Sequence, residues 1–197
     1  MVMLQQHRGE RGWDFRRILS GWADQARTVH VWEPYLVEAH QTELLSFFVD
    51  AVRAIGVTQV RVHTALTTGR ASSEAVGEAV GRLDSLQHAY APRGVSITVH
   101  DEAFHRRRWL FENGAGQLMV SMWSDLGLHF FQRPRSPAAR VALALRPVLD
   151  NAILIEHGPV PVGTARPAAA PPDRQLRRVR VRALLAAIEN LKKRQRA

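Results

Sequence analysis

The stretch of the chain best suited to chemistry is His-Arg-Arg-Arg-Trp-Leu-Phe-Glu-Asn-Gly at residues 105–114. It holds an imidazole at His105, a guanidinium at Arg107 and a carboxylate at Glu112. An imidazole can act as a covalent nucleophile, and a guanidinium can hold a phosphate through two parallel hydrogen bonds. These residues are therefore candidates for catalysis on a phosphate ester. The same stretch is also typical of a basic strand that ends in an Asn-Gly turn.

Side-chain alternation divides the arginine run within this stretch. Neighbouring residues of a strand point to opposite faces. We therefore expect Arg107 on the face of His105, and Arg106 and Arg108 on the other face. Each guanidinium can bind an anion, so all of them are candidate ligand-binding residues.

The segments around this stretch alternate between strand and helix patterns. β-Branched runs predict strands, and apolar residues at helical spacing predict helices. The strands are expected within 27–36, 57–67, 95–101, 106–114 and 117–123, and the helices over 40–56 and up to about 91. A last strand or short helix is expected within 139–159. This order requires crossover connections and predicts an α/β fold with a mixed, mostly parallel sheet flanked by helices.

Composition divides the chain into four segments. Residues 1–27 predict a polar N-terminal lead-in with one short helix, and residues 28–160 form the predicted α/β domain. Residues 161–173 are rich in proline and alanine, which is typical of an extended linker. Residues 174–197 predict a basic amphipathic helix.

The tail carries nearly all of the excess positive charge. The chain has a net charge of +9, and residues 165–197 contribute ten basic and two acidic residues, which leaves 17 basic and 16 acidic residues in 1–164. Such a tail can bind an anionic membrane, a nucleic acid or a partner helix. Its apolar seam is narrow and has no Trp or Phe, which favours a protein partner or an oligomer contact. The seam consists of Val181, Leu184, Ile188 and Leu191.

Several classes of protein and site are disfavoured by composition. The absence of cysteine excludes disulfides and thiolate metal sites. No uncharged apolar run approaches the ~20 residues of a membrane span, and the first residues lack the apolar core of a secretory signal. We therefore expect a cytoplasmic protein, with a peripheral membrane location as an alternative. No histidine pair has metal-ligand spacing, so we expect no metal and no cofactor. His30, His63, His129 and His157 are expected in or near the core.

Six blocks of sequence, in order, resemble the C-terminal phospholipase D-like domain of MIT-domain-containing proteins. They are VWEPYL, RVHTAL, RGVSITV, HRRRWLFENG, LGLHFFQRP and LRPVLDNAILIEH, and they span about Val29 to His157. The phospholipase D superfamily carries His-x-Lys followed, after four intervening residues, by Asp. Here His105 is kept, and Arg107 and Glu112 stand in the positions of Lys and Asp.

The resemblance implies a single phospholipase D-like lobe of a kind generally regarded as non-catalytic, which binds acidic phospholipid headgroups and self-associates. His105, Arg107 and Asn113 match the His, Arg and Asn of the family pattern. Arg146 matches a family arginine, which can meet either a phosphate or a buried carboxylate. Tyr35 is a further candidate ligand contact, because it follows the first predicted strand at an edge where α/β sheets often place ligands.

Two functional hypotheses follow. The leading one is a non-catalytic module that binds anionic phosphate groups of acidic phospholipid or nucleic acid, forms a homodimer and recruits a protein partner through its C-terminal helix. The alternative is a metal-independent phosphodiesterase or nuclease in a bacterial defence system, with His105 as nucleophile and Arg107 and Glu112 beside it. A bacterial origin is suggested by 25 arginines against 2 lysines. Because the superfamily chemistry needs two histidines and the motif occurs once, this enzyme would have to act as a dimer.

Overall fold

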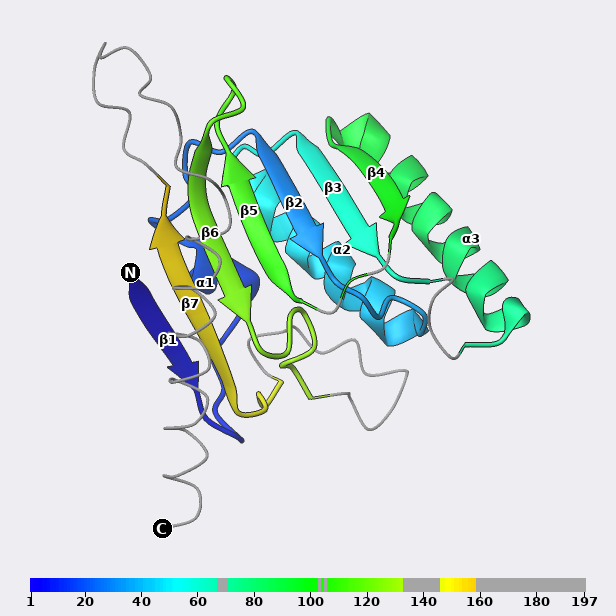
Figure 1. The fold of residues 1–197 in the computed structure, drawn as a ribbon, viewed down its shortest axis with the longest axis horizontal. Helices are drawn as coiled ribbons and strands as arrows, with labels where there is room; N and C mark the ends of the chain where they lie inside the picture. The colour runs from blue at the N-terminus through cyan, green and yellow to red at the C-terminus, as the bar shows by residue number, and fades with distance from the viewer. Residues whose placement is uncertain (67–70, 103, 105, 133–145, 159–197) are drawn as a thin grey trace. The chain divides into compact units, whose positions relative to one another are not determined.

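The computed structural model describes residues 1–66, 71–102, 104, 106–132 and 146–158. The described part of the chain is built around a seven-stranded sheet with the strand order β1-β7-β6-β5-β2-β3-β4 (Figure 1). His105, the predicted linker 161–173 and the predicted helix 174–197 lie outside the described residues, and so do the four seam residues of that helix.

The elements follow one another in an alternating order. They are β1 (Val2–Gln6), α1 (Phe15–Leu19), β2 (Thr28–Trp32), α2 (Ala39–Ala54), β3 (Gln59–Thr64), α3 (Ser73–Tyr90), the 3-10 turn η1 (Ala91–Arg93), β4 (Ser96–Asp101), β5 (Arg108–Glu112), β6 (Leu118–Ser124) and β7 (Asn151–His157). Two pairs of neighbouring strands are parallel, β2 with β3 and β3 with β4. The other pairs of neighbouring strands are antiparallel. The prediction of a mixed α/β sheet with flanking helices is confirmed, with a smaller parallel part than expected.

The helices begin and end where local sequence signals place them. The side chain of Ser72 caps α3 by accepting a hydrogen bond from the backbone N–H of Ala75. At the start of α2, the backbone N–H of Glu38 donates to the side chain of Gln41. Gly56 follows α2 with a φ of 95°, which favours glycine after a helix. None of the described helices is both long and apolar enough to cross a bilayer.

The N-terminal segment differs from the expectation of a lead-in outside the domain. Residues Val2–Gln6 form an edge strand that pairs antiparallel with β7. Its inward side chain Gln6 is buried and accepts a hydrogen bond from the side-chain amide of Asn151 at 2.9 Å. The one short helix expected within residues 1–27 is α1, which ends at Leu19, two residues before Gly21 with its φ of 77°.

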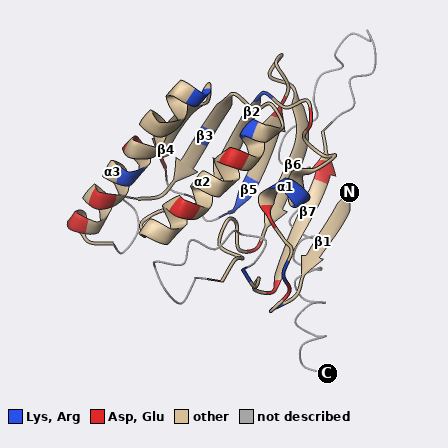
Figure 2. Cartoon of the chain, turned by 180° about the vertical axis from the view of Figure 1, so that it is seen from behind, with Lys and Arg blue, Asp and Glu red and all other residues tan. Residues whose placement is uncertain are grey.

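All three α-helices lie on one face of the sheet, as the two opposite views agree (Figures 1 and 2). The core between this face and the helices is centred on Phe15 of α1. Its ring makes edge contacts with four other aromatic rings at centroid distances of 5.3 to 5.9 Å, those of Phe48, Trp109, Phe130 and Phe131. Among the described residues no helix covers the opposite face, which we call the open face.

Replacing Phe15 by Ala is expected to lower the free energy of unfolding by about 3–5 kcal/mol, because it removes the ring that joins α1 to four aromatic neighbours. Urea unfolding followed by tryptophan fluorescence measures the change. As a control, Val80→Ala on the exposed side of α3 should change stability by no more than about 0.5 kcal/mol. Equal effects of the two substitutions would contradict the assigned core.

Candidate functional site

Arg107 is held in place by a buried carboxylate at the carboxyl end of β2. Glu33 follows β2 directly, and Arg107 precedes β5, the antiparallel neighbour of β2. The Nε atom of Arg107 donates to Oε1 of Glu33 at 3.2 Å, and its Nη1 donates to the backbone carbonyl of Asp125 at 2.8 Å. Glu33 has no solvent exposure. A buried carboxylate needs such partners, since an unpaired buried charge is strongly unfavourable.

The loop after β6 closes over the other side of Glu33. The backbone N–H of Leu128 donates to Oε2 of Glu33 at 2.9 Å. Nε2 of His129 lies 3.3 Å from Oε1 of Glu33, close enough for an ion pair but not aligned as a hydrogen bond. Burial raises the pKa of Asp125 in the same loop, and the nearby Arg107 partly opposes this shift. Glu33 therefore joins two segments that are far apart in the sequence.

Gly127 allows the loop to approach this closely. Its φ is 59°, in the left-handed region that favours glycine. A Cβ atom at this position would collide with Oε2 of Glu33 and lie 2.6 Å from Cδ of Arg107. The glycine is thus required both by its backbone conformation and by the ion pair beneath it.

Arg107 keeps hydrogen-bonding capacity beyond these contacts. A guanidinium has five N–H donors, and the two described hydrogen bonds use the Nε and Nη1 groups. Nη2 makes no hydrogen bond within the described part of the chain and is not buried. The ring of Tyr35, which is 49% exposed, lies 5.2 Å from the guanidinium carbon. The arrangement can present one oriented guanidinium edge to a ligand.

The neighbouring arginines lie elsewhere. Arg106 is exposed. Arg108 begins β5 on the open face, where its guanidinium lies between the rings of Trp32 and Trp123 at 4.1 and 5.4 Å. The structure therefore does not bring Arg107 and Arg108 into one pocket.

Glu112 and Asn113 lie at the opposite end of β5 from Arg107. Five residues of extended strand separate Arg107 from Glu112 by roughly 16 Å. The Asn113 side chain holds the β5–β6 turn, because its Oδ1 accepts hydrogen bonds from the backbone N–H groups of Ala115 and Gln117 at 2.9 and 3.0 Å. The structure does not place either residue with Arg107.

Arg146 is paired with a carboxylate of α2. Its two terminal nitrogens lie 2.9 and 3.5 Å from the carboxylate oxygens of Glu43, and its guanidinium carbon lies 5.4 Å from the ring of Phe47. The carboxylate of Glu43 is only partly buried, with 31% of its side chain exposed, and a phosphate-binding role of Arg146 stays a prediction.

A row of stacked side chains crosses the open face, and sequence reasoning did not find it. Trp32, His63 and His100 are register partners on β2, β3 and β4. The rings of Trp32 and His63 stack at 4.2 Å with an interplanar angle of 4°, and those of His63 and His100 at 5.1 Å with 20°. His30 and His63, expected in or near the core, are mostly buried but lie on this face. His157 is exposed, contrary to that expectation.

His63 and His30 lie in a row between the carboxylates of Glu102 and Glu112. Nδ1 of His63 contacts the carboxylate of Glu102, and Nε2 of His63 lies 3.2 Å from Nδ1 of His30. With Glu102 ionised, the proton on His63 resides at Nδ1, so that His30 donates from its own Nδ1. Nε2 of His30 lies 3.5 Å from the carboxylate of Glu112. Burial lowers the pKa of both imidazoles, although the carboxylates oppose the shift.

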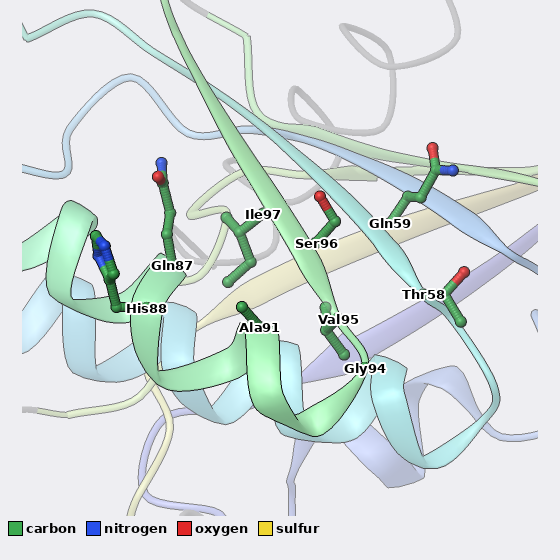
Figure 3. Close-up of a pocket in the computed structure, with 9 residues that line it drawn as sticks. All are labelled: Thr58, Gln59, Gln87, His88, Ala91, Gly94, Val95, Ser96 and Ile97. Carbon is green, nitrogen blue, oxygen red and sulfur yellow. The ribbon is translucent and has the colours of Figure 1, made fainter.

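A shallow groove of about 500 Å³ lies at the other end of the parallel strands (Figure 3). It is lined by the starts of β3 and β4 and by the end of α3, with Gln59, Gln87 and His88 as its larger polar side chains. None of the residues around Glu33 lines it. The groove is therefore separate from the Arg107 site.

Comparison with known families identifies the family of the chain. The model of a family described as the phospholipase D-like domain at the C-terminus of MIT matches residues 12–155, more than half of the chain. The chain belongs to this family. No curated protein matches the chain. The match to the MIT C-terminal phospholipase D-like domain includes Glu33, Arg107 and the loop at Gly127, whereas β1 lies outside it.

Replacing Gly127 by Ala is expected to destabilise this MIT C-terminal phospholipase D-like domain by more than the ~1–2 kcal/mol of a left-handed backbone alone, because Cβ displaces Glu33 from Arg107. Gly116→Ala is the matched control. Gly116 has a φ of 74° but no atom within 4 Å of the added Cβ. Urea unfolding compares the two variants, and equal losses would contradict the close packing assigned to Gly127.

Acidification is expected to destabilise the domain through His30 and His63. Their pKa values are lowered in the folded state, so below the ordinary value of about 6.5 the unfolded chain binds more protons than the folded one. Stability should therefore fall as the pH drops from about 7.5 to 5.5, and His30→Gln should reduce this fall. His88→Gln, at an exposed position of α3, should leave it unchanged. Urea midpoints across the range test this, and identical slopes for wild type and His30→Gln would contradict it.

Proposed function

We propose that the protein is a non-catalytic phospholipase D-like module that binds the phosphate group of an acidic phospholipid through Arg107. The observation that carries the proposal is the way Arg107 is held. Glu33 and the Asp125 carbonyl fix its orientation, while Nη2 remains accessible and without a partner among the described residues. A pre-oriented guanidinium binds phosphate through charge-assisted hydrogen bonds at little entropic cost.

Charge distribution favours a single phosphate group over a nucleic-acid backbone. A backbone ligand calls for a stripe of basic residues. Residues 1–164 carry 17 basic and 16 acidic residues. Figure 2 shows acidic and basic residues mixed along the helices on the helical side of the sheet. One oriented guanidinium beside the exposed Tyr35 suits a headgroup phosphate at a membrane surface.

The separation of the motif residues supports binding without catalysis. Glu112 contacts His30 on the open face, at the end of β5 that lies away from Arg107, so it is not placed to act on a phosphate held by Arg107. The alternative remains a dimeric phosphodiesterase with His105 as nucleophile. Homodimer formation, recruitment of a partner by the helix at 174–197 and a cytoplasmic location stay predictions.

Removing the guanidinium is expected to weaken binding to vesicles of phosphatidylcholine with phosphatidylglycerol. Because Arg107→Ala alone would leave Glu33 buried without its cation, the informative variant is the double substitution Arg107→Gln with Glu33→Gln. We expect a roughly 10- to 100-fold weaker affinity in vesicle sedimentation, the loss of about 1.5–3 kcal/mol of charge-assisted hydrogen bonding. Arg16→Ala on α1, an exposed arginine, is the matched control and should bind as the wild type does.

Three further assays distinguish phospholipid binding from nucleic-acid binding and from catalysis. Inorganic phosphate as a competitor tests whether the headgroup phosphate is what is recognised. Tighter binding of single-stranded DNA than of the vesicles would favour nucleic acid instead. Hydrolysis of a chromogenic phosphodiester in EDTA, lost in His105→Ala, would establish the enzyme and overturn the proposal. Unchanged vesicle binding by the double variant would also overturn it.

A further inference from the structure

His129 shares a carboxylate oxygen with Arg107. Nε2 of His129 and Nε of Arg107 lie 3.3 and 3.2 Å from the same Oε1 of Glu33. The imidazole is only partly buried, with 18% of its side chain exposed, but its Nε2 atom is covered and has no aligned hydrogen bond. Its Nδ1 atom has no hydrogen-bond partner within the described residues and is not buried. One ring nitrogen thus faces Glu33, and the other is accessible.

The carboxylate determines where a proton resides on this ring. A bare lone pair on Nε2 would face a fully buried carboxylate oxygen, which is electrostatically unfavourable. The neutral imidazole therefore carries its proton on Nε2, and Nδ1 is an acceptor unless a second proton is added to it. The accessible nitrogen changes from an acceptor into a donor when that happens.

The charged groups around His129 largely compensate one another. Glu33 after β2 and Arg107 before β5 offset each other, and Asp125 lies in the same loop as His129. From α2, His40 makes an edge contact with the His129 ring at 6.1 Å and is itself 3.2 Å from Glu38. Glu43 of α2 is paired with Arg146. A proton added to Nδ1 of His129 therefore raises the charge of the group formed by Glu33, Arg107, Asp125 and His129 by one unit, which favours a phosphate beside it.

We propose that His129 is the proton-linked second contact of the anion site, so that a phosphate group binds to Arg107 and to protonated His129 with the uptake of one proton. This inference rests on the proposed function and adds its regulation. Because the anion favours the protonated imidazole, binding strengthens as the pH falls, by up to about tenfold per pH unit for one linked proton. At a given lipid composition, the membrane-bound fraction is then larger in acid.

The experiment measures proton uptake together with affinity. Vesicles of phosphatidylcholine with phosphatidylglycerol are the probe, since a phosphodiester headgroup keeps its charge over the range in which histidines titrate. Calorimetric titrations in buffers of different ionisation enthalpy give the number of protons taken up on binding. The full chain is used as wild type, as His129→Gln and as His88→Gln, the last a control with an exposed histidine on α3.

We expect wild type and His88→Gln to take up a proton and to bind more tightly in acid. His129→Gln should bind with the weaker affinity at every pH and take up none. Wild-type binding without proton uptake, or uptake that persists in His129→Gln, would overturn the role of His129 and leave the proposed function standing. Failure of the wild type to bind the vesicles at any pH would instead overturn the proposed function.

A second measurement guards against a variant that does not fold. Nitrogen-15 spectra of the histidine rings in the wild type report which nitrogen carries the proton. The expected state of His129 at neutral pH is protonated Nε2 and bare Nδ1. The opposite tautomer would contradict the inference without any substitution.

Discussion

The structure around the site depends on one charge that is completely removed from solvent. The carboxylate of Glu33 contacts Arg107, the backbone N–H of Leu128 and the ring of His129. Desolvating a carboxylate costs several kcal/mol, which only well-placed partners can offset. Because those partners come from the start of β5 and from the loop after β6, the requirement orders both segments. It also means that the same ion pair contributes to folding and orients the guanidinium toward a ligand.

Much of the fold could be predicted from local patterns. Alternating Val29 and Val31, and Val60 and Val62, mark strands that face the helices, and the apolar spacing from Leu44 to Val52 marks α2. β1 was missed because a short run of three apolar residues and two glutamines shows no clear alternation, and its strand character is evident only once its pairing with β7 is known. The hairpin was expected from Asn-Gly, but the left-handed residue is Gly116, since Asn113 closes a longer loop through its side chain.

The contacts of the site could be predicted only in part from the sequence, because they depend on which strands become neighbours. Alternation correctly separates Arg107 from Arg108, because it is a property of one strand. The partnership with Glu33 depends on which strand becomes the neighbour of β5, and that is not a local property. The sequence motif grouped Glu112 with Arg107 by their spacing. In an extended strand, however, residues five positions apart lie at opposite ends of the strand. The histidines were assigned to the core because a pattern of alternation does not show which face the helices leave open.

The position of β7 also affects how the chain can fold. β7 lies between β1 and β6 in the sheet, so the first strand of the chain has no described neighbour until residues 151–157 have been made. During synthesis on the ribosome, the parallel group β2–β4 and the β5–β6 hairpin can assemble first, whereas β1 must wait for a partner about 150 residues away. Such long-range pairing closes a large loop and is slow. Until then β1 remains an unpaired apolar strand that a chaperone or another nascent chain can capture.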